Sequence, residues 1–180
     1  GDGSVTITCF SNSGLVLHLD AGNTSSYNGT GTTWYDVSGN GTNATLVSTT
    51  YSAANGGSIV FNGSTSYADF TSNIGSTSVV TAEMWVKTNS LNAPNGAMYF
   101  GFNFYDIWTS NGNLGFNTSA GDQYGISSSQ VDYLGIVGSW KHLVFVMNSG
   151  SKTNNKIYVN GELQTLSQLQ GTFGSVNSNF

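Results

Sequence analysis

Basic residues and cysteine are scarce in this sequence of 180 residues. It contains four lysines and no arginine, and charged residues make up 7% of the chain, against about 25% in a typical soluble domain. Lysine and arginine provide most nucleic-acid affinity by neutralising phosphates, so this composition argues against a nucleic-acid partner. The single cysteine, Cys9, excludes an intramolecular disulfide. No apolar run approaches the ~18 residues of a membrane-spanning helix, so we expect no membrane span.

Short alternating runs of apolar and β-branched residues are present instead of helical periodicity. Aromatic residues make up 13% of the chain, which is enough to supply a core, and clusters of glycine, asparagine and serine separate the runs. The pattern predicts an all-β, two-sheet antiparallel sandwich with almost no helix, formed as a single domain over residues 1–180. We expect strands near residues 5–10, 15–20, 44–47, 58–62, 66–70, 79–88, 97–102, 105–109, 114–117, 124–127, 142–147, 156–160 and 162–166.

Two details of this pattern make specific predictions. Asn160 and Gly161 stand between two strand runs, and this dipeptide is typical of a type I′ hairpin, in which both central residues need positive φ. Trp85 and Trp140 each lie in a strand run that is rich in apolar residues. We therefore expect both indole rings to lie in the core.

Five segments occur in the order found in one family of domains. They are residues 14–23 (GLVLHLDAGN), 32–46 (TTWYDVSGNGTNATL), 56–70 (GGSIVFNGSTSYADF), 81–87 (TAEMWVK) and 139–162, which contains SWKHLVFVMN and KIYVNGE. With these segments the chain resembles laminin-G-like domains of the concanavalin A-like jelly-roll class. The variant it resembles is the one in bacteriophage structural proteins and bacterial surface proteins.

The resemblance also implies a function. It suggests a non-catalytic binding or decoration module on a virion or cell surface that takes a glycan or host-surface polysaccharide as its ligand. Two alternatives remain open, namely a structural subunit whose strands pair between subunits and a carbohydrate-binding appendage of a secreted hydrolase. The neutral, hydroxyl-rich composition also suits a location on a virion, outside the cell or on its surface.

The end of the chain departs from the pattern of these domains. Their hairpin is followed by further strands, including one that returns to pair near the first, whereas here a polar segment runs from residue 171 to 180. A sheet that lacks a strand exposes unpaired backbone groups, which invite a strand from another chain. We therefore expect the residues after Leu166 to lie against a neighbouring copy, in a homo-oligomeric assembly, or against another virion or surface protein, or the chain to continue beyond Phe180.

Carboxylates for catalysis are sparse. Hydrolases of similar fold carry an acid and a nucleophile on one strand in the pattern Glu-x-Asp-x-x-Glu, about 5–5.5 Å apart. The glutamates of this chain are Glu83, which has no acidic neighbour on its strand, and Glu162, which follows a hairpin turn. Neither His18 nor His142 accompanies a Gly-x-Ser-x-Gly motif. We therefore expect a protein that is not an enzyme.

Calcium is the cofactor that the resemblance implies. Laminin-G-like domains hold Ca²⁺ at the rim of the sandwich through aspartates and carbonyl groups, and this hard cation prefers oxygen ligands. The resemblance places Asp20 and Asp36 near one rim, where Asn23 would add an amide oxygen. The alternative is that Asp36 accepts a turn bond from the amide of Ser38 or Gly39.

A glycan ligand requires an aromatic face for the sugar ring and polar groups for its hydroxyls. The segment that contains Tyr105, Asp106 and Trp108, together with Tyr124 further along, supplies these groups and predicts the binding residues. The alternative is that aromatic residues which alternate along a strand belong to the core of the sandwich.

Overall fold

The computed structural model describes residues 14–70, 77–92, 97–102, 105–118, 121–174 and 176. The chain divides into two compact units, Gly1–Ile74 and Gly75–Phe180. The expectation of a single domain over residues 1–180 stays a prediction. The strand expected at residues 5–10, with Cys9, lies outside the described residues.

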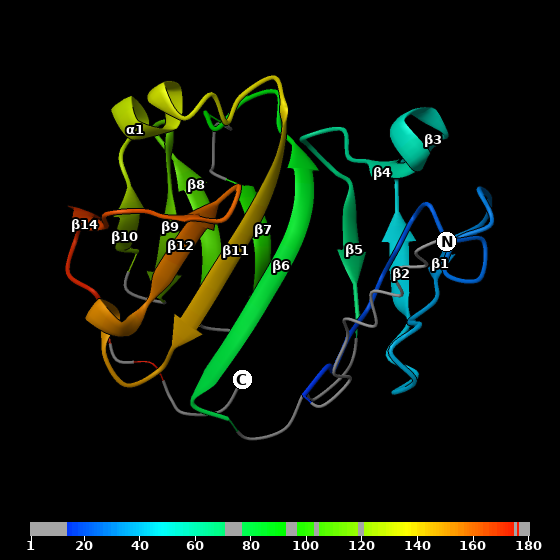
Figure 1. Ribbon diagram of the computed structural model, residues 1–180, viewed down its shortest axis with the longest axis horizontal. Coiled ribbons are helices and arrows are strands. Elements are labelled where there is room, and N and C mark those ends of the chain that lie inside the picture. The colour runs from blue at the N-terminus through cyan, green and yellow to red at the C-terminus, as the bar shows by residue number, and fades with distance from the viewer. Residues whose placement is uncertain are drawn as a thin grey trace, which may run out of the picture. The chain divides into compact units, whose positions relative to one another are not determined.

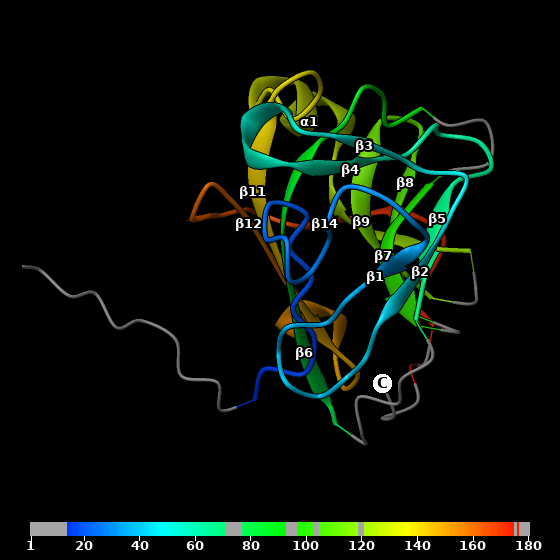
Figure 2. The same ribbon diagram turned by 90° about the vertical axis from the view of Figure 1, so that its right-hand side faces the viewer.

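The first unit contains two small antiparallel sheets (Figure 2). One has the order β1-β2-β5, and the other is the hairpin of β3 and β4. The bounds are β1 Thr33–Trp34, β2 Ala44–Val47, β3 Thr50–Ser52, β4 Ser58–Val60 and β5 Tyr67–Asp69, with a short 3₁₀ turn at Ala54–Gly56. Residues 15–20, expected as a strand, are not one. Their backbone bonds to a loop instead, since the amide of Val37 donates to the carbonyl of His18.

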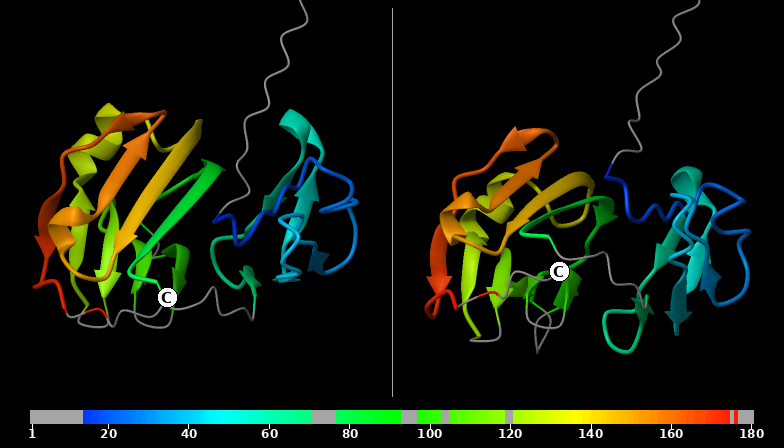
Figure 3. Two further views of the ribbon diagram at one scale, coloured as in Figure 1. Left: turned by 60° about the horizontal axis from the view of Figure 1, so that its bottom comes forward. Right: turned by 90° about the horizontal axis from the view of Figure 1, so that it is seen from below.

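The second unit is a sandwich of two antiparallel sheets (Figures 1 and 3). The five-stranded sheet has the order β14-β10-β9-β8-β7, and the four-stranded sheet has the order β13-β12-β11-β6. The bounds are β6 Val79–Lys87, β7 Ala97–Phe102, β8 Tyr105–Ser110, β9 Asn113–Thr118, β10 Gln123–Ile126, β11 Trp140–Asn148, β12 Lys156–Val159, β13 Glu162–Leu163 and β14 Ser167–Gln170. The predicted all-β sandwich is confirmed.

The core of this unit lies between the two sheets. Phe116 of β9 meets Phe145 of β11 edge to face, with ring centres 6.3 Å apart, and neither ring is exposed. The hydroxyl of Tyr105 on β8 donates to the carbonyl of Asn148 at the end of β11, 3.5 Å away. Alternating residues of both sheets bury their apolar side chains here, among them Ile107, Leu114, Ile126, Leu143, Met147 and Ile157. Burial of these side chains is the main stabilising contribution to the sandwich.

Helix is a minor component of the described chain. There is one α-helix of six residues, α1 (Ser128–Tyr133), and two 3₁₀ turns of three residues each, the second at Lys152–Asn154. Ser127 caps α1 and accepts from the amide of Gln130, while the side chain of Gln130 accepts from the amide of Ser127. This reciprocal capping box stabilises a helix that the sequence analysis did not predict.

The hairpin prediction is confirmed. Asn160 and Gly161 have φ of 51° and 84°, and they join β12 to β13 through the pair Val159 and Glu162. Both central residues thus adopt the left-handed conformation that a type I′ turn requires.

The expected burial of the two tryptophans is wrong. On β6 the inward side chains Val80 and Ala82 are buried, whereas Trp85 points to the other face and is 66% exposed. Trp140, at the start of β11, pairs with Lys87 and is half-buried. Side-chain alternation along a strand, rather than the apolar character of the neighbours, decides which rings enter the core.

The expectation for the residues after Leu166 also needs correction. Ser167–Gln170 forms β14, which pairs with β10 of the same chain, and the side-chain amide of Gln168 donates to the carbonyl of Gln123 at 3.2 Å. The edge of β10 therefore accepts a strand from its own chain. Homo-oligomeric assembly stays a prediction.

Candidate functional site

The outer face of the five-stranded sheet carries the candidate site. Along β8, Tyr105, Ile107 and Thr109 point into the core, and the intervening residues Asp106 and Trp108 are half-buried on the opposite face. Trp108 thus presents an aromatic surface outside the core of the sandwich.

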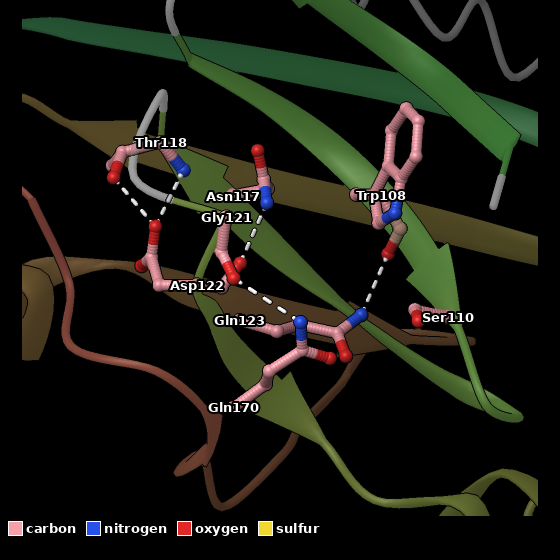
Figure 4. A pocket seen from close by; sticks show the side chains of 8 residues that line it. All are labelled: Trp108, Ser110, Asn117, Thr118, Gly121, Asp122, Gln123 and Gln170. Atoms are coloured by element: carbon pink, nitrogen blue, oxygen red, sulfur yellow. Dashed lines mark hydrogen bonds between the residues drawn. The ribbon is translucent and has the colours of Figure 1, made fainter. Parts of the chain in front are cut away.

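A hollow of about 290 Å³ lies beside Trp108 (Figure 4). Its volume is near the lower end of the ~300–1,000 Å³ found for small-molecule sites, which suits a ligand of a few rings at most. The side chains around it are mainly amides, hydroxyls and one carboxylate, and they come from β8, β9, β10, β14 and the turn before β10. The lining residues are Trp108, Ser110, Asn117, Thr118, Gly121, Asp122, Gln123 and Gln170.

Two glycines provide the surface next to the indole ring. Trp108 lies opposite Gly115 of β9, and Gly115 lies opposite Gly125 of β10. A Cβ atom on Gly115 would lie 2.6 Å from the carbonyl oxygen of Tyr124, so a side chain does not fit there. The row across these three strands therefore contains one aromatic ring followed by bare backbone.

Hydrogen bonds to the main chain fix the amide side chains of the hollow. The side-chain nitrogen of Gln123 donates to the carbonyl of Trp108 at 3.0 Å, and that of Gln170 donates to the carbonyl of Gly121 at 3.1 Å. The side-chain nitrogen of Asn117 donates to the carbonyl of Asp122 at 2.6 Å. The Oε1 atom of Gln123 is buried and has no hydrogen-bond partner among the described residues, so it can accept a bond from a ligand.

Asp122 is the carboxylate of the hollow, and only 1% of the residue is exposed. Its Oδ1 atom accepts from the amide of Thr118 at 2.9 Å and from the hydroxyl of the same residue. Its Oδ2 atom is buried and has no hydrogen-bond partner in the described part of the chain. One oxygen of this carboxylate is therefore fixed, and the other is unused.

Asp106 is a second carboxylate nearby. It lies opposite Asn117, the residue whose side chain bonds to Asp122. Burial, and next the negative charge of Asp122, raise the pKa of Asp106 to about 7. Its Oδ1 atom is also buried without a partner among the residues described.

The structure separates the four predicted glycan-binding residues into two pairs. Asp106 and Trp108 lie on the outer face, but Tyr105 is 1% exposed and packs in the core against Phe116. Tyr124 faces the same side as Phe116, its register partner. The two tyrosines therefore follow the alternative interpretation, in which alternating aromatics belong to the core.

Sequence analysis did not predict the polar lining of the hollow. Asn117, Asp122, Gln123 and Gln170 come from β9, β10, β14 and the turn before β10, and only the register between strands brings them beside Trp108. The alternation along β8 indicates the outer face, but the sequence does not specify which residues of other strands lie next to it.

The predicted calcium ligand Asp36 is already saturated with hydrogen bonds. Its Oδ1 atom accepts from the amides of His18 and Ser38 at 2.9 and 2.8 Å, and its Oδ2 atom accepts from the Ser38 hydroxyl and the Thr42 amide at 2.7 and 3.0 Å. Burial alone would raise the pKa of Asp36, but these bonds outweigh it and hold that pKa below its usual value. A carboxylate offers about four lone-pair sites, and all are used here.

The other two predicted ligands also stabilise their own turns. The side chain of Asp20 accepts from the amide of Gly22 at 2.8 Å, and that of Asn23 accepts from the amide of Ser25 at 2.9 Å. Within the described ranges, no group of three or more His, Cys, Asp or Glu residues could hold a metal ion. The turn interpretation of Asp36 is confirmed, and calcium binding at Asp20, Asn23 and Asp36 stays a prediction.

The two glutamates lie far apart in the strand order. Glu83 is on β6 at one edge of the four-stranded sheet, where its Oε1 atom lies 2.8 Å from Nε2 of His142 on β11. Glu162 is on β13 at the other edge. The two therefore do not form a carboxylate pair.

A family comparison agrees with this architecture. Residues 61–180, which are 120 of the 180 residues, match the laminin-G-type family described as the concanavalin A-like lectin/glucanases superfamily. The chain belongs to this superfamily. The predicted resemblance is thus confirmed, while its bacteriophage and bacterial-surface variant stays a prediction.

The whole hollow lies inside the part that matches the concanavalin A-like superfamily, whereas Asp20, Asn23 and Asp36 lie before it. No curated protein and no solved structure matches the chain. Among the described helices, none has the length and apolar character needed to cross a membrane.

Proposed function

We propose that the chain is a non-catalytic carbohydrate-binding module that holds its ligand in the hollow beside Trp108. One observation carries this proposal: an aromatic ring and a set of fixed amide and hydroxyl groups face the same small hollow. Sugar recognition uses this combination, because the C–H face of a pyranose packs on an aromatic ring while its hydroxyls bond to polar side chains.

The charges around the hollow favour a neutral sugar over an acidic one. Its lining contains Asp122 and no lysine. A sugar carboxylate or sulfate would lie near this negative charge without a counterion, and an unpaired charge in a partly buried site is costly. A neutral sugar brings hydroxyl donors, which suit the free Oε1 atom of Gln123.

The setting of such a module is also part of the proposal. A charge-poor, hydroxyl-rich chain of a superfamily that includes lectins suits adhesion to glycans from a virion or a cell surface. A carbohydrate-binding appendage of a secreted hydrolase would use the same hollow, and sequencing the genes beside the full reading frame distinguishes the two settings.

A glycan-array or affinity-electrophoresis experiment tests the proposal. We expect Trp108→Ala to weaken binding of the best neutral glycan at least about tenfold, which corresponds to ~1.4 kcal/mol. Trp85→Ala is the matched control, because Trp85 is an exposed tryptophan on the outer face of the other sheet. Loss of binding in the Trp85 variant alone would reject the hollow as the site.

An assay for new reducing ends tests the absence of catalysis. Asp106 and Asp122 lie close enough for the charge of one to raise the pKa of the other. A hydrolase could use such a pair, so the bound polysaccharide should be incubated with the protein and with an Asp122→Asn variant. We expect no cleavage above background, and cleavage that disappears in the variant would replace the proposed module with an enzyme.

A further inference from the structure

The row of outer-face residues that contains Trp108 continues to the edge strand β7. Met98 of β7 is the direct partner of Trp108 on β8, and directly opposed residues of antiparallel strands point to the same face of a sheet. In strand order the row consists of Met98, Trp108, Gly115, Gly125 and Ser167. The two large apolar side chains of the row are therefore neighbours.

The side chain of Met98 is accessible to a ligand. It is 57% exposed, whereas Met147 in the core is 0% exposed, and methionine is a residue that proteins usually bury. Because β7 is the last strand in the order of the described sheet, this exposed side chain lies at the edge. A single exposed apolar residue is ordinary on a protein surface, but this one adjoins the aromatic ring beside the hollow and enlarges its apolar surface.

Two features of β7 position the Met98 side chain. The register between β7 and β8 shifts between Met98 and Phe100, so Tyr99 is the extra residue of a bulge, and bulges redirect side chains. The second feature is Gly101, where a Cβ atom would lie 2.6 Å from the sulfur of Met98 and closer still to the Cβ atom of its partner Asp106. The absence of a side chain at Gly101 therefore allows the Met98 side chain to extend along β7.

We propose that Met98 forms a second sugar subsite beside Trp108, so that the ligand is an oligosaccharide rather than a single sugar; this inference rests on the proposed function of the hollow. The lining of the hollow comes from β8 and from strands on the side away from β7, so Trp108 stands between the hollow and Met98. The hollow, of about 290 Å³, is near the lower limit for a small-molecule site, so further sugar units lie outside it. Met98 offers them an apolar surface, whereas Gly115 on the other side of Trp108 has no side chain to offer.

The two subsites differ in what they can select. The fixed amides around the hollow orient the hydroxyls of the first sugar, because hydrogen bonds are directional. The thioether of Met98 makes no strong directional bond, and its flexible side chain adapts to irregular apolar surfaces. The second subsite should therefore increase the affinity for longer ligands about five- to tenfold, with little preference for the configuration of the second sugar.

Titration calorimetry of the full chain with sugars of increasing length tests the proposal. The probes are glucose with maltose and cellobiose, galactose with galactobiose, and mannose with mannobiose, all taken in parallel. In the pair that binds, we expect the wild type to bind the disaccharide about five- to tenfold more tightly than the monosaccharide. Met98→Ala should remove this gain and leave the affinity for the monosaccharide unchanged.

Two further variants show whether the gain depends on an apolar side chain at this position. Met98→Leu keeps an apolar side chain of similar volume and should retain the gain, whereas Met98→Gln should lose most of it. The matched control is Leu163→Ala, because Leu163 is an apolar residue of similar exposure, 59%, on β13 of the other sheet. We expect this control to bind like the wild type.

Oxidation of methionine provides a readout of position. Hydrogen peroxide transfers an oxygen atom to an exposed thioether, which becomes a sulfoxide while the peroxide becomes water. Mass spectrometry of peptides should show that Met98 is oxidised faster than Met147, which is buried in the core. We expect a bound disaccharide to slow the oxidation of Met98 and a bound monosaccharide to leave it unchanged.

A gain for the disaccharide that survives in Met98→Ala overturns the inference, and so does oxidation of Met98 that a bound disaccharide does not slow. If Trp108→Ala still weakens binding in those cases, the proposed function stands and only the second subsite is rejected. Binding that is indifferent to Trp108→Ala, or its absence for every probe and for the glycan array, rejects the hollow and the subsite together.

Discussion

Replacing Asp36 by asparagine tests how a single carboxylate stabilises the loop that follows β1. The substitution keeps the shape of the side chain but replaces one acceptor oxygen by an NH₂ donor. Two of the four bonds then fail, because the amide of Thr42 and the hydroxyl of Ser38 meet a donor instead of Oδ2. Hydrogen bonds to charged groups contribute about 1.5–3 kcal/mol each, and the partial exposure of Asp36 lowers their combined loss to ~2 kcal/mol.

The pH dependence of this loss follows from the pKa of Asp36. That pKa is lower in the folded chain than its usual value of 3.8, so the folded state favours the ionised form. The stabilisation is therefore present above about pH 4 and is lost as the pH falls through the folded pKa. We expect the wild type and Asp36→Asn to differ at pH 7 and to converge in acid.

Hydrogen exchange measures this effect locally, and urea unfolding measures it globally. The amides of His18, Ser38 and Thr42 should exchange faster in Asp36→Asn, while Asp69→Asn, at an exposed position of β5 in the same unit, should leave them unchanged. Equal free energies of unfolding for the wild type and Asp36→Asn at pH 7 would refute the argument. Unchanged exchange at these three amides would also contradict it.

Three further predictions concern the second unit. Burial and a neighbouring carboxylate raise the pKa of Asp106 from 3.8 to about 7, so the free energy of unfolding should fall as the pH rises between these values. At pH 8 Asp106→Asn should therefore be more stable than the wild type by ~2 kcal/mol, half the full ~4 kcal/mol because solvent reaches the group. Phe145→Ala should cost about 3–5 kcal/mol in urea unfolding, since the ring is fully buried, and the exposed Trp85→Ala less than ~1 kcal/mol. Gly161→Ala should lower the unfolding free energy by about 1–2 kcal/mol because φ is 84° there, whereas Gly150→Ala, outside the positive-φ region, should cost less.

Much of the second unit could be predicted from the sequence because its strands alternate clearly. Residues 97–102 form β7 with the predicted bounds, and residues 79–88 differ from β6 by one residue. Trp85 was misplaced because the apolar character of its neighbours was given more weight than its alternation with Ala82. Alternation is a property of strand geometry and was the more reliable guide.

The remaining elements lack a local signal. The segment SQLQ of β14 has no apolar pattern, and it becomes a strand because the edge of β10 offers it backbone partners. The candidate site also lacks a local sequence signal, because Asp122 and Gln123 lie in a polar stretch that is typical of a loop. Their role depends on the register of β9 and β10, which long-range packing determines rather than the sequence of either strand.

The paired glycines next to Trp108 restrict how the outer face of this sheet can change. Gly115 of β9 and Gly125 of β10 are direct partners on neighbouring strands, and the backbones lie so close that neither position accepts a side chain. A substitution at either position therefore cannot add a side chain to this face without separating β9 from β10. Relatives with other ligand preferences would instead have to vary the side chains that line the hollow, such as Trp108 on β8 and Gln170 on the edge strand β14. The same sheet could in this way present different ligand specificities over an unchanged backbone.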